Sequence, residues 1–142
     1  MANNEFSEKW RDRFKFFNQH GLPGMDSYRA ALGQLSFSRR TRIHCNGYAF
    51  IFGFLYFCIL GLWKKGLVLF ITAIVVNLLI SLIEGLMNVN LNVLDKLMNF
   101  VYMYICSTSA NTAYYLRAVK GIDSWNPLQG LTRKSINTLS RR

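Results

Sequence analysis

Apolar residues recur at helical intervals near the N-terminus and form long blocks in the middle of the chain. Over residues 5–20 they recur every three or four positions, with charged residues between them. This spacing predicts an amphipathic helix, ended by Gly21 and Pro23. Its apolar face consists of Phe6, Trp10, Phe14 and Phe17.

A second short helix is predicted over residues 27–35, with Asp26 as its N-cap. Its apolar face comprises Tyr28, Ala31, Leu32 and Leu35. The two helices can pack against each other. Alternatively, the aromatic stripe of the first can lie among lipid headgroups, and the pattern is compatible with both arrangements.

Three apolar runs follow, over residues 47–62, 66–83 and 97–116, and a polar loop over 84–96 separates the last two. The first run would reach only about 24 Å as a straight helix. A bilayer has a hydrocarbon core of about 30 Å, so this run is short for a membrane span. The other two are long enough to cross.

The positions of the cations favour one topology. If residues 47–62 dip into the membrane and return, or lie along its surface, Lys64 and Lys65 face the cytoplasm together with both termini. Lys96 is then the only cation exported, in agreement with the positive-inside rule. Three transmembrane helices are the alternative, and would place the basic C-terminal tail outside.

The predicted fold class is therefore all-α, an integral membrane protein with cytoplasmic N-terminal amphipathic helices, a short re-entrant or interfacial segment and a two-helix transmembrane hairpin. The predicted regions are 1–46, a membrane domain over 47–116 and a basic tail over 117–142. The tail can lie on the inner leaflet or be disordered. Residues 1–46 contain no apolar stretch typical of a signal peptide, so we expect this region in the cytoplasm.

The 142-residue chain has a formal net charge of +10, which raises the question of nucleic-acid binding. Most cations flank the apolar middle, however, and this segregation is typical of segments that face anionic lipid. We therefore expect a bilayer containing anionic lipids as partner, and no nucleic acid. The residues expected at the membrane boundary are Trp63, Lys64, Lys65, Glu84, Arg39, Arg40 and Arg42.

The sequence contains no arrangement of residues typical of an enzyme. It lacks the common nucleophile, metalloprotease and phosphate-loop motifs. His20 and His44 have no partners at ligand spacing, and the three cysteines are too widely spaced for a metal site. We expect no catalytic residue, cofactor or metal.

Polar and small residues inside the apolar runs are candidates for helix packing or interaction. Asn77 is expected to bond to the polar face of the third run, which carries Ser107 and Asn111; a polar path for a solute through an oligomer is the alternative. The full set of candidates is Asn77, Ser107, Asn111, Ala49, Gly53, Gly61, Ser81 and Gly85.

Four stretches resemble one family: KWRDRFKFFNQHGLP (9–23), CNGYAFIFGFLYFCILGLWKKGL (45–67), ANTAYYLRAVKG (110–121) and SWNP (124–127). The chain resembles the YigF-like family of small bacterial inner-membrane proteins, known as domain of unknown function 2628. The resemblance implies location in the bacterial inner membrane and carries over no catalytic residue.

Three functional classes are compatible with these features. The first is a non-enzymatic membrane protein that acts through protein–protein or protein–lipid interaction, with a possible homo-oligomer. The second is an immunity protein that neutralises a pore-forming or membrane-targeted bacterial toxin. The third is a subunit of an oligomeric transporter or channel.

Overall fold

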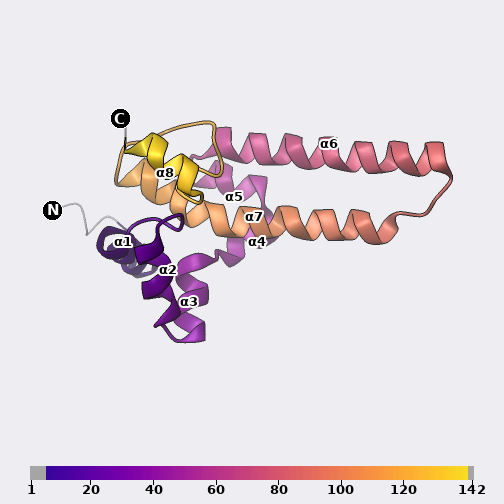
Figure 1. Ribbon diagram of the computed structural model, residues 1–142. Coiled ribbons are helices and arrows are strands. Elements are labelled where there is room, and N and C mark those ends of the chain that lie inside the picture. Colours follow the sequence, from indigo (N-terminus) through magenta and orange to yellow (C-terminus); the bar gives the residue numbers. More distant parts are fainter. Residues whose placement is uncertain (1–5, 141–142) are drawn as a thin grey trace. The chain divides into compact units, whose positions relative to one another are not determined.

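The computed structural model describes residues 6–140, and all regular structure in that range is helical (Figure 1). Residues 1–5 and 141–142, the ends of the predicted N-terminal region and tail, lie outside the described residues. The helices are α1 (Glu8–His20), α2 (Asp26–Gly33), α3 (Phe37–His44), α4 (Gly47–Phe52), α5 (Phe54–Ile59), α6 (Trp63–Met87), α7 (Asn92–Ala118) and α8 (Arg133–Leu139).

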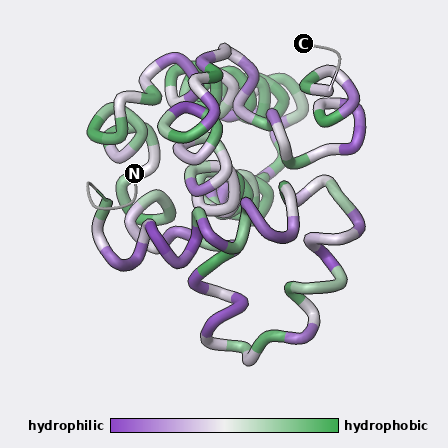
Figure 2. Tube along the Cα trace, turned by 90° about the vertical axis from the view of Figure 1, so that its left-hand side faces the viewer, coloured by the Kyte–Doolittle hydropathy of each residue, from purple (hydrophilic) through white to green (hydrophobic). Residues whose placement is uncertain are grey.

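The chain forms two compact units that do not follow the three predicted regions. The described part of the first unit comprises residues 6–46, 108–123 and 128–140. The second comprises residues 47–107 and 124–127. Helix α7 contributes to both, with the division after Ser107. Figure 2 shows how hydrophobic and hydrophilic stretches alternate along the trace.

The first unit has an aromatic core built on α1. Phe14 and Phe17 are buried, and Phe6 and Trp10 pack against the same cluster. The predicted aromatic stripe therefore packs inside the protein. The pattern did not include Phe16, which is also buried and meets the ring of Tyr28 at 5.4 Å.

Helix α2 begins one residue earlier than predicted, and Asp26 is not its N-cap. The N-cap is Met25, and no side chain caps this end. The Asp26 carboxylate instead accepts hydrogen bonds of 2.6 and 2.8 Å from the guanidinium of Arg133 on α8. The predicted apolar face is confirmed, because Tyr28 and Leu32 are buried in the core.

Helix α3 was not predicted. It contains three arginines, and Ile43 is its one buried residue, so its apolar periodicity is weak. In the tail, α8 places Ile136 and Leu139 against the aromatic core, so this part of the tail is ordered and packed on protein. Contact of the tail with the inner leaflet stays a prediction.

In the second unit the first apolar run is divided into α4 and α5. The break is at Gly53, whose φ of +48° suits a residue without a Cβ. A second turn at Gly61 (φ +71°) leads directly into α6. Residues 47–62 thus form two short helices and a turn, and not one straight helix.

Helices α6 and α7 are both longer than predicted. Because α6 continues to Met87 and α7 begins at Asn92, the predicted loop over 84–96 shrinks to residues 88–91. Asn88 adopts the left-handed conformation that ends α6 (φ 52°). Within the second unit α6 and the first part of α7 lie side by side and antiparallel (Figure 1).

Candidate functional sites

The second unit exposes an unusually apolar surface. Among the described residues, every exposed large hydrophobic side chain belongs to this unit except Phe37, Val119 and Leu128. Helix α6 is the one helix of residues 6–140 that is long and apolar enough to cross a membrane, and most of it is not covered by protein. Exposed patches of this extent mark surfaces that contact a membrane or another protein.

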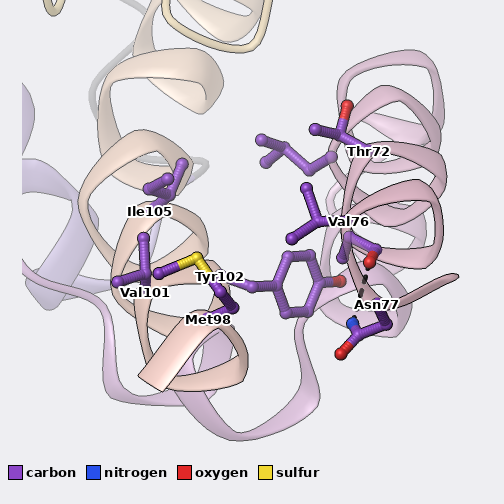
Figure 3. A pocket seen from close by; sticks show the side chains of 9 residues that line it. Thr72, Val76, Asn77, Met98, Val101, Tyr102 and Ile105 are labelled. Atoms are coloured by element: carbon purple, nitrogen blue, oxygen red, sulfur yellow. Dashed lines mark hydrogen bonds between the residues drawn. The ribbon is translucent and has the colours of Figure 1, made fainter. Parts of the chain in front are cut away.

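A small apolar cavity of about 110 Å³ lies between α6 and α7 (Figure 3). Its polar lining groups come from Thr72, Asn77 and Tyr102, and the remaining walls are hydrocarbon or thioether. An apolar cavity of this kind stays free of water unless several polar groups converge on it. The other lining residues are Leu69, Ala73, Val76, Met98, Val101 and Ile105.

Asn77 lies at this cavity and bonds to α7, but not through the predicted polar face. Asn99 Nδ2 donates to Asn77 Oδ1 at 3.2 Å, and Asn77 Nδ2 donates to the Ala73 carbonyl at 2.8 Å. Asn99 also donates to the Asp95 carbonyl at 2.9 Å. Asn99 was not among the candidate residues, because it lies near the start of the third run, beside residues assigned to a loop.

Asn111 is placed in the first unit, where its amide is fully used. Its Oδ1 accepts from Asn46 Nδ2 at 3.0 Å, and its Nδ2 donates to the carbonyls of Ile43 (3.0 Å) and Cys45 (3.3 Å). Asn46 and Asn111 are each only 1% exposed. We call this arrangement the Asn111 lock. It holds residues 43–46, at the end of α3, against α7.

Thr112, the residue directly after Asn111, is buried in a different way. Its hydroxyl oxygen has no hydrogen-bond partner among the described residues. Its methyl group lies close to Gly130, where an added Cβ would be 2.9 Å from Thr112 Cγ2. Ser107, the remaining candidate on this face, is buried in the second unit.

The small residues proposed for packing fall into two groups. Ala49 is fully buried, and a Cβ on Gly53 would lie 3.0 Å from the hydroxyl of Tyr102. Ser81 and Gly85, in contrast, are exposed, and nothing lies within 4 Å of a Cβ at Gly85. Gly61 allows the turn described above.

Gly66 marks a close approach of two helices that was not predicted. A Cβ on Gly66 would lie 2.6 Å from Cβ of Phe57, so α5 and α6 meet in contact with the bare backbone of α6. A segment that dips in and returns was expected over residues 47–62, but Gly66 lies outside that segment and was not among the candidates.

The predicted boundary residues at the start of α6 have different environments. The ring of Trp63 meets that of Trp125 edge to face at 5.5 Å, and both rings are about half exposed. Trp125 comes from the SWNP stretch, which belongs to the second unit. Lys64 is partly buried, whereas Lys65 is almost completely buried at 1% exposure.

Glu84 closes the other end of the helix pair. Its Oε1 accepts a hydrogen bond of 2.5 Å from the backbone N–H of Leu91. Asn90 Oδ1 accepts another from the N–H of Asn92 at 3.1 Å. Glu84 and Asn90 thus accept hydrogen bonds from two backbone N–H groups at the start of α7. A negative charge at this position also interacts favourably with the helix dipole.

The three arginines of α3 are all exposed. Arg39 pairs with Asp12 of α1 at 3.0 Å. The carbonyl of Arg42 accepts a bond from Arg13 Nε at 2.8 Å. Arg40 lies near His44 and, after burial itself, is the second cause of the lowered pKa of that imidazole.

His44 forms the nearest arrangement to a reactive group in the first unit. Its Nδ1 lies 3.4 Å from the hydroxyl of Tyr28, whose pKa is raised by burial and by the nearby Cys45. This contact joins α2 to the end of α3. Within residues 6–140 no group of three or more His, Cys, Asp or Glu is placed to hold a metal ion.

A family model described as a protein of unknown function, DUF2628, matches residues 3–120. The protein named Uncharacterized protein YigF in Escherichia coli K12 is 33% identical over 130 residues, covering 89% of this chain and 95% of that protein. The YigF proteins of Salmonella typhimurium and Salmonella typhi show the same identity and coverage. No solved structure matches.

Proposed function

The chain belongs to the DUF2628 family, and from this premise we propose that it is a non-enzymatic protein of the bacterial inner membrane that acts through protein–protein or protein–lipid interaction. In this proposal the second unit lies in the bilayer. The first unit is a basic cytoplasmic domain.

The partition of charge and exposed apolar surface between the units carries the proposal. The cations of the second unit are Lys64, Lys65 and Lys96, whereas all other Lys and Arg belong to the first. Most of the exposed large hydrophobic residues of the described chain belong instead to the second unit. A protein surrounded by water on all sides gains nothing from this separation, but a bilayer stabilises it, because hydrocarbon covers the apolar unit and anionic headgroups attract the basic one.

The helix pair supports a hairpin topology. Helix α6 has 25 residues and is about 37 Å long, enough for the hydrocarbon core. Helix α7 is more polar, and we propose that it returns to the cytoplasm beside α6. The turn over 88–91 is the exported tip, and Glu84 accepts a hydrogen bond from the backbone N–H of Leu91 there. The short helices α4 and α5 fit a re-entrant segment, because the chain reverses between α5 and α6.

The hydrogen bonding of the Asn111 amide supports an interaction role over transport. A residue that lines a solute path offers hydrogen-bonding groups to the path. The amide of Asn111 is instead engaged by Asn46, Ile43 and Cys45 within its own unit.

Thiol labelling in intact cells tests the topology. Single cysteines replace Lys64, Asn90 or Ser140 in a variant whose three native cysteines are changed to serine or alanine. A membrane-impermeant maleimide should label position 90 from outside, and should label positions 64 and 140 only after permeabilisation. Labelling of 64 and 140 in intact cells, with 90 protected, would mean three spans and would overturn the proposal.

A further inference from the structure

Phe37 is an anomaly in the first unit. It is 85% exposed, whereas the other exposed large hydrophobic residues of this unit's described part, Val119 and Leu128, are near 40%. The unit otherwise buries its aromatic rings in one core. A phenylalanine that presents its whole ring to solvent is unfavourable unless something covers it.

The helical repeat places Phe37 on the outward half of α3. Ile43 is fully buried and marks the inward side. At about 100° per residue, Thr41 lies about 160° and Phe37 about 120° around the helix axis from Ile43. Arg40 lies about 60° from Ile43 on the same side as Phe37, and Arg42 about 100° from it on the other side. Arg39 points toward α1, where it pairs with Asp12. The outward half thus carries one exposed aromatic ring, with an exposed guanidinium group near each of its two edges.

The chain keeps this face close to the second unit along the sequence. Helix α3 ends at His44, and the second unit begins at Gly47. The connecting residues 45 and 46 are held within the first unit by the Asn111 lock. If the second unit lies in the bilayer, α3 is only a few residues from the point where the chain enters it.

We propose that α3 is an interfacial helix that docks on the cytoplasmic leaflet, with the ring of Phe37 inserted at the headgroup boundary and Arg40 and Arg42 bound to the phosphates of anionic lipids. This inference rests on the proposed function. Guanidinium groups form charge-assisted hydrogen bonds to phosphate oxygens, and a protruding aromatic ring is stabilised at the headgroup level. A single exposed ring with exposed arginines fits a lipid surface better than an acidic protein partner, which needs a complementary pocket.

Spin labels on the full chain test this docking. A nitroxide at Phe37→Cys, in the same cysteine-free background, is compared with one at Gln19→Cys, an exposed site on α1. The protein is reconstituted in vesicles of phosphatidylcholine with phosphatidylglycerol. We expect the label at 37 to be more accessible to oxygen and less to a water-soluble nickel complex, whereas the label at 19 stays accessible to nickel.

Removing the charges gives the matched control. Each of Arg40→Gln and Arg42→Gln should lower the equilibrium constant for docking of α3 roughly five-fold. Neutral vesicles, which remove the attraction of both arginines, should lower it further. Equal nickel accessibility at 37 and 19 would overturn the proposal. So would a label that is water-exposed in vesicles but protected in native membranes, because a protein would then cover Phe37.

A second measurement avoids the cysteine-free background. In the wild-type chain, amide hydrogen exchange of residues 36–44 should be several-fold slower in anionic than in neutral vesicles. Unchanged exchange would contradict docking. This failure is distinguishable from failure of the proposed function, since labelling at Asn90 reports the hairpin independently of α3.

Discussion

Replacing Asn111 with alanine removes the centre of the Asn111 lock. The substitution deletes one acceptor and both amide donors, and leaves three buried partners: the amide of Asn46 and the carbonyls of Ile43 and Cys45. Because Asn46 and Asn111 are each 1% exposed, bulk water cannot readily replace what is lost. The perturbation is therefore larger than loss of the contacts alone.

The magnitude follows from these three bonds. A typical intramolecular hydrogen bond contributes about 1 kcal/mol net, and a buried group left unsatisfied costs about 1–3 kcal/mol. We expect Asn111→Ala to lower the free energy of unfolding of the first unit by about 3 kcal/mol or more. Asn111→Asp should be at least as damaging, since a carboxylate would face two carbonyl oxygens.

A double-mutant cycle isolates one bond of the lock. The variants are Asn46→Ala, Asn111→Ala and the double substitution, and the expected coupling free energy is about 1 kcal/mol in favour of the pair. The assay is denaturant unfolding of the full chain in mild detergent, followed by the fluorescence of Trp10, which packs against the core of the first unit. Gln19→Ala, at an exposed site, controls for nonspecific effects.

The reasoning is refuted if Asn111→Ala costs less than about 1 kcal/mol while Trp10 still reports a cooperative transition. Zero coupling between positions 46 and 111 would refute the specific bond, even if each single variant is destabilised. A loss of stability in Gln19→Ala equal to that in Asn111→Ala would show that the assay does not resolve the lock.

Three further predictions concern single positions. Thr112→Val should leave stability unchanged or raise it by up to about 1 kcal/mol, because it replaces a buried hydroxyl that has no partner by a methyl group; a clear loss in a thermal melt would contradict this. Gly66→Ala should destabilise the second unit by about 1–3 kcal/mol through the overlap of its Cβ with α5, whereas Gly85→Ala, with open space around it, should change stability by less than about 1 kcal/mol in the same assay. Burial, assisted by the Arg40 charge, lowers the pKa of His44 below 6.5, so the unfolded chain binds this proton more readily than the folded one. The free energy of unfolding should therefore be greatest above pH 6.5 and decline as the pH falls toward the lowered pKa. If the decline is undiminished in a His44→Gln variant, His44 is not its origin.

Strong periodicity predicted the first two helices well. The aromatic stripe of α1 recurs over three turns, and its burial was readable because one helix face gathers all its members. Helix α3 was missed for the opposite reason. It is only two turns long and buries one side chain, so its propensity and pattern are weak, and tertiary contacts stabilise it.

The polar loop over 84–96 shows a second limit. Gly85 and the asparagines of this stretch suggested a break, but residues 84–87 and 92–96 are helical. Glu84 and Asn90 supply the hydrogen-bond acceptors that allow α7 to start at once after a short turn. Such bonds join residues that composition alone cannot pair.

The candidate residues also divide into properties that the sequence predicted and partners that only the structure showed. That the amide of Asn77 needs a partner followed from its apolar surroundings, and that Asn111 belongs to a polar face followed from the helical spacing of the third run. Which partners they have did not, because Asn111 bonds to residues 65 or more positions away, and Asn77 bonds across the α6–α7 pair. The close approach at Gly66 and the exposed ring of Phe37 likewise became visible only when neighbouring helices were in place.

By itself the sequence determined the all-helical class, the separation of a basic part from an apolar part, and the family. These properties depend on composition and on local period, which are recorded residue by residue. Only the tertiary structure decided that the first apolar run bends at Gly53 and folds back at Gly61, that the tail packs on the aromatic core, and that α3 presents Phe37 outward. These are outcomes of contacts between distant segments, whose energies depend on distance and orientation in space, and a one-dimensional pattern contains neither.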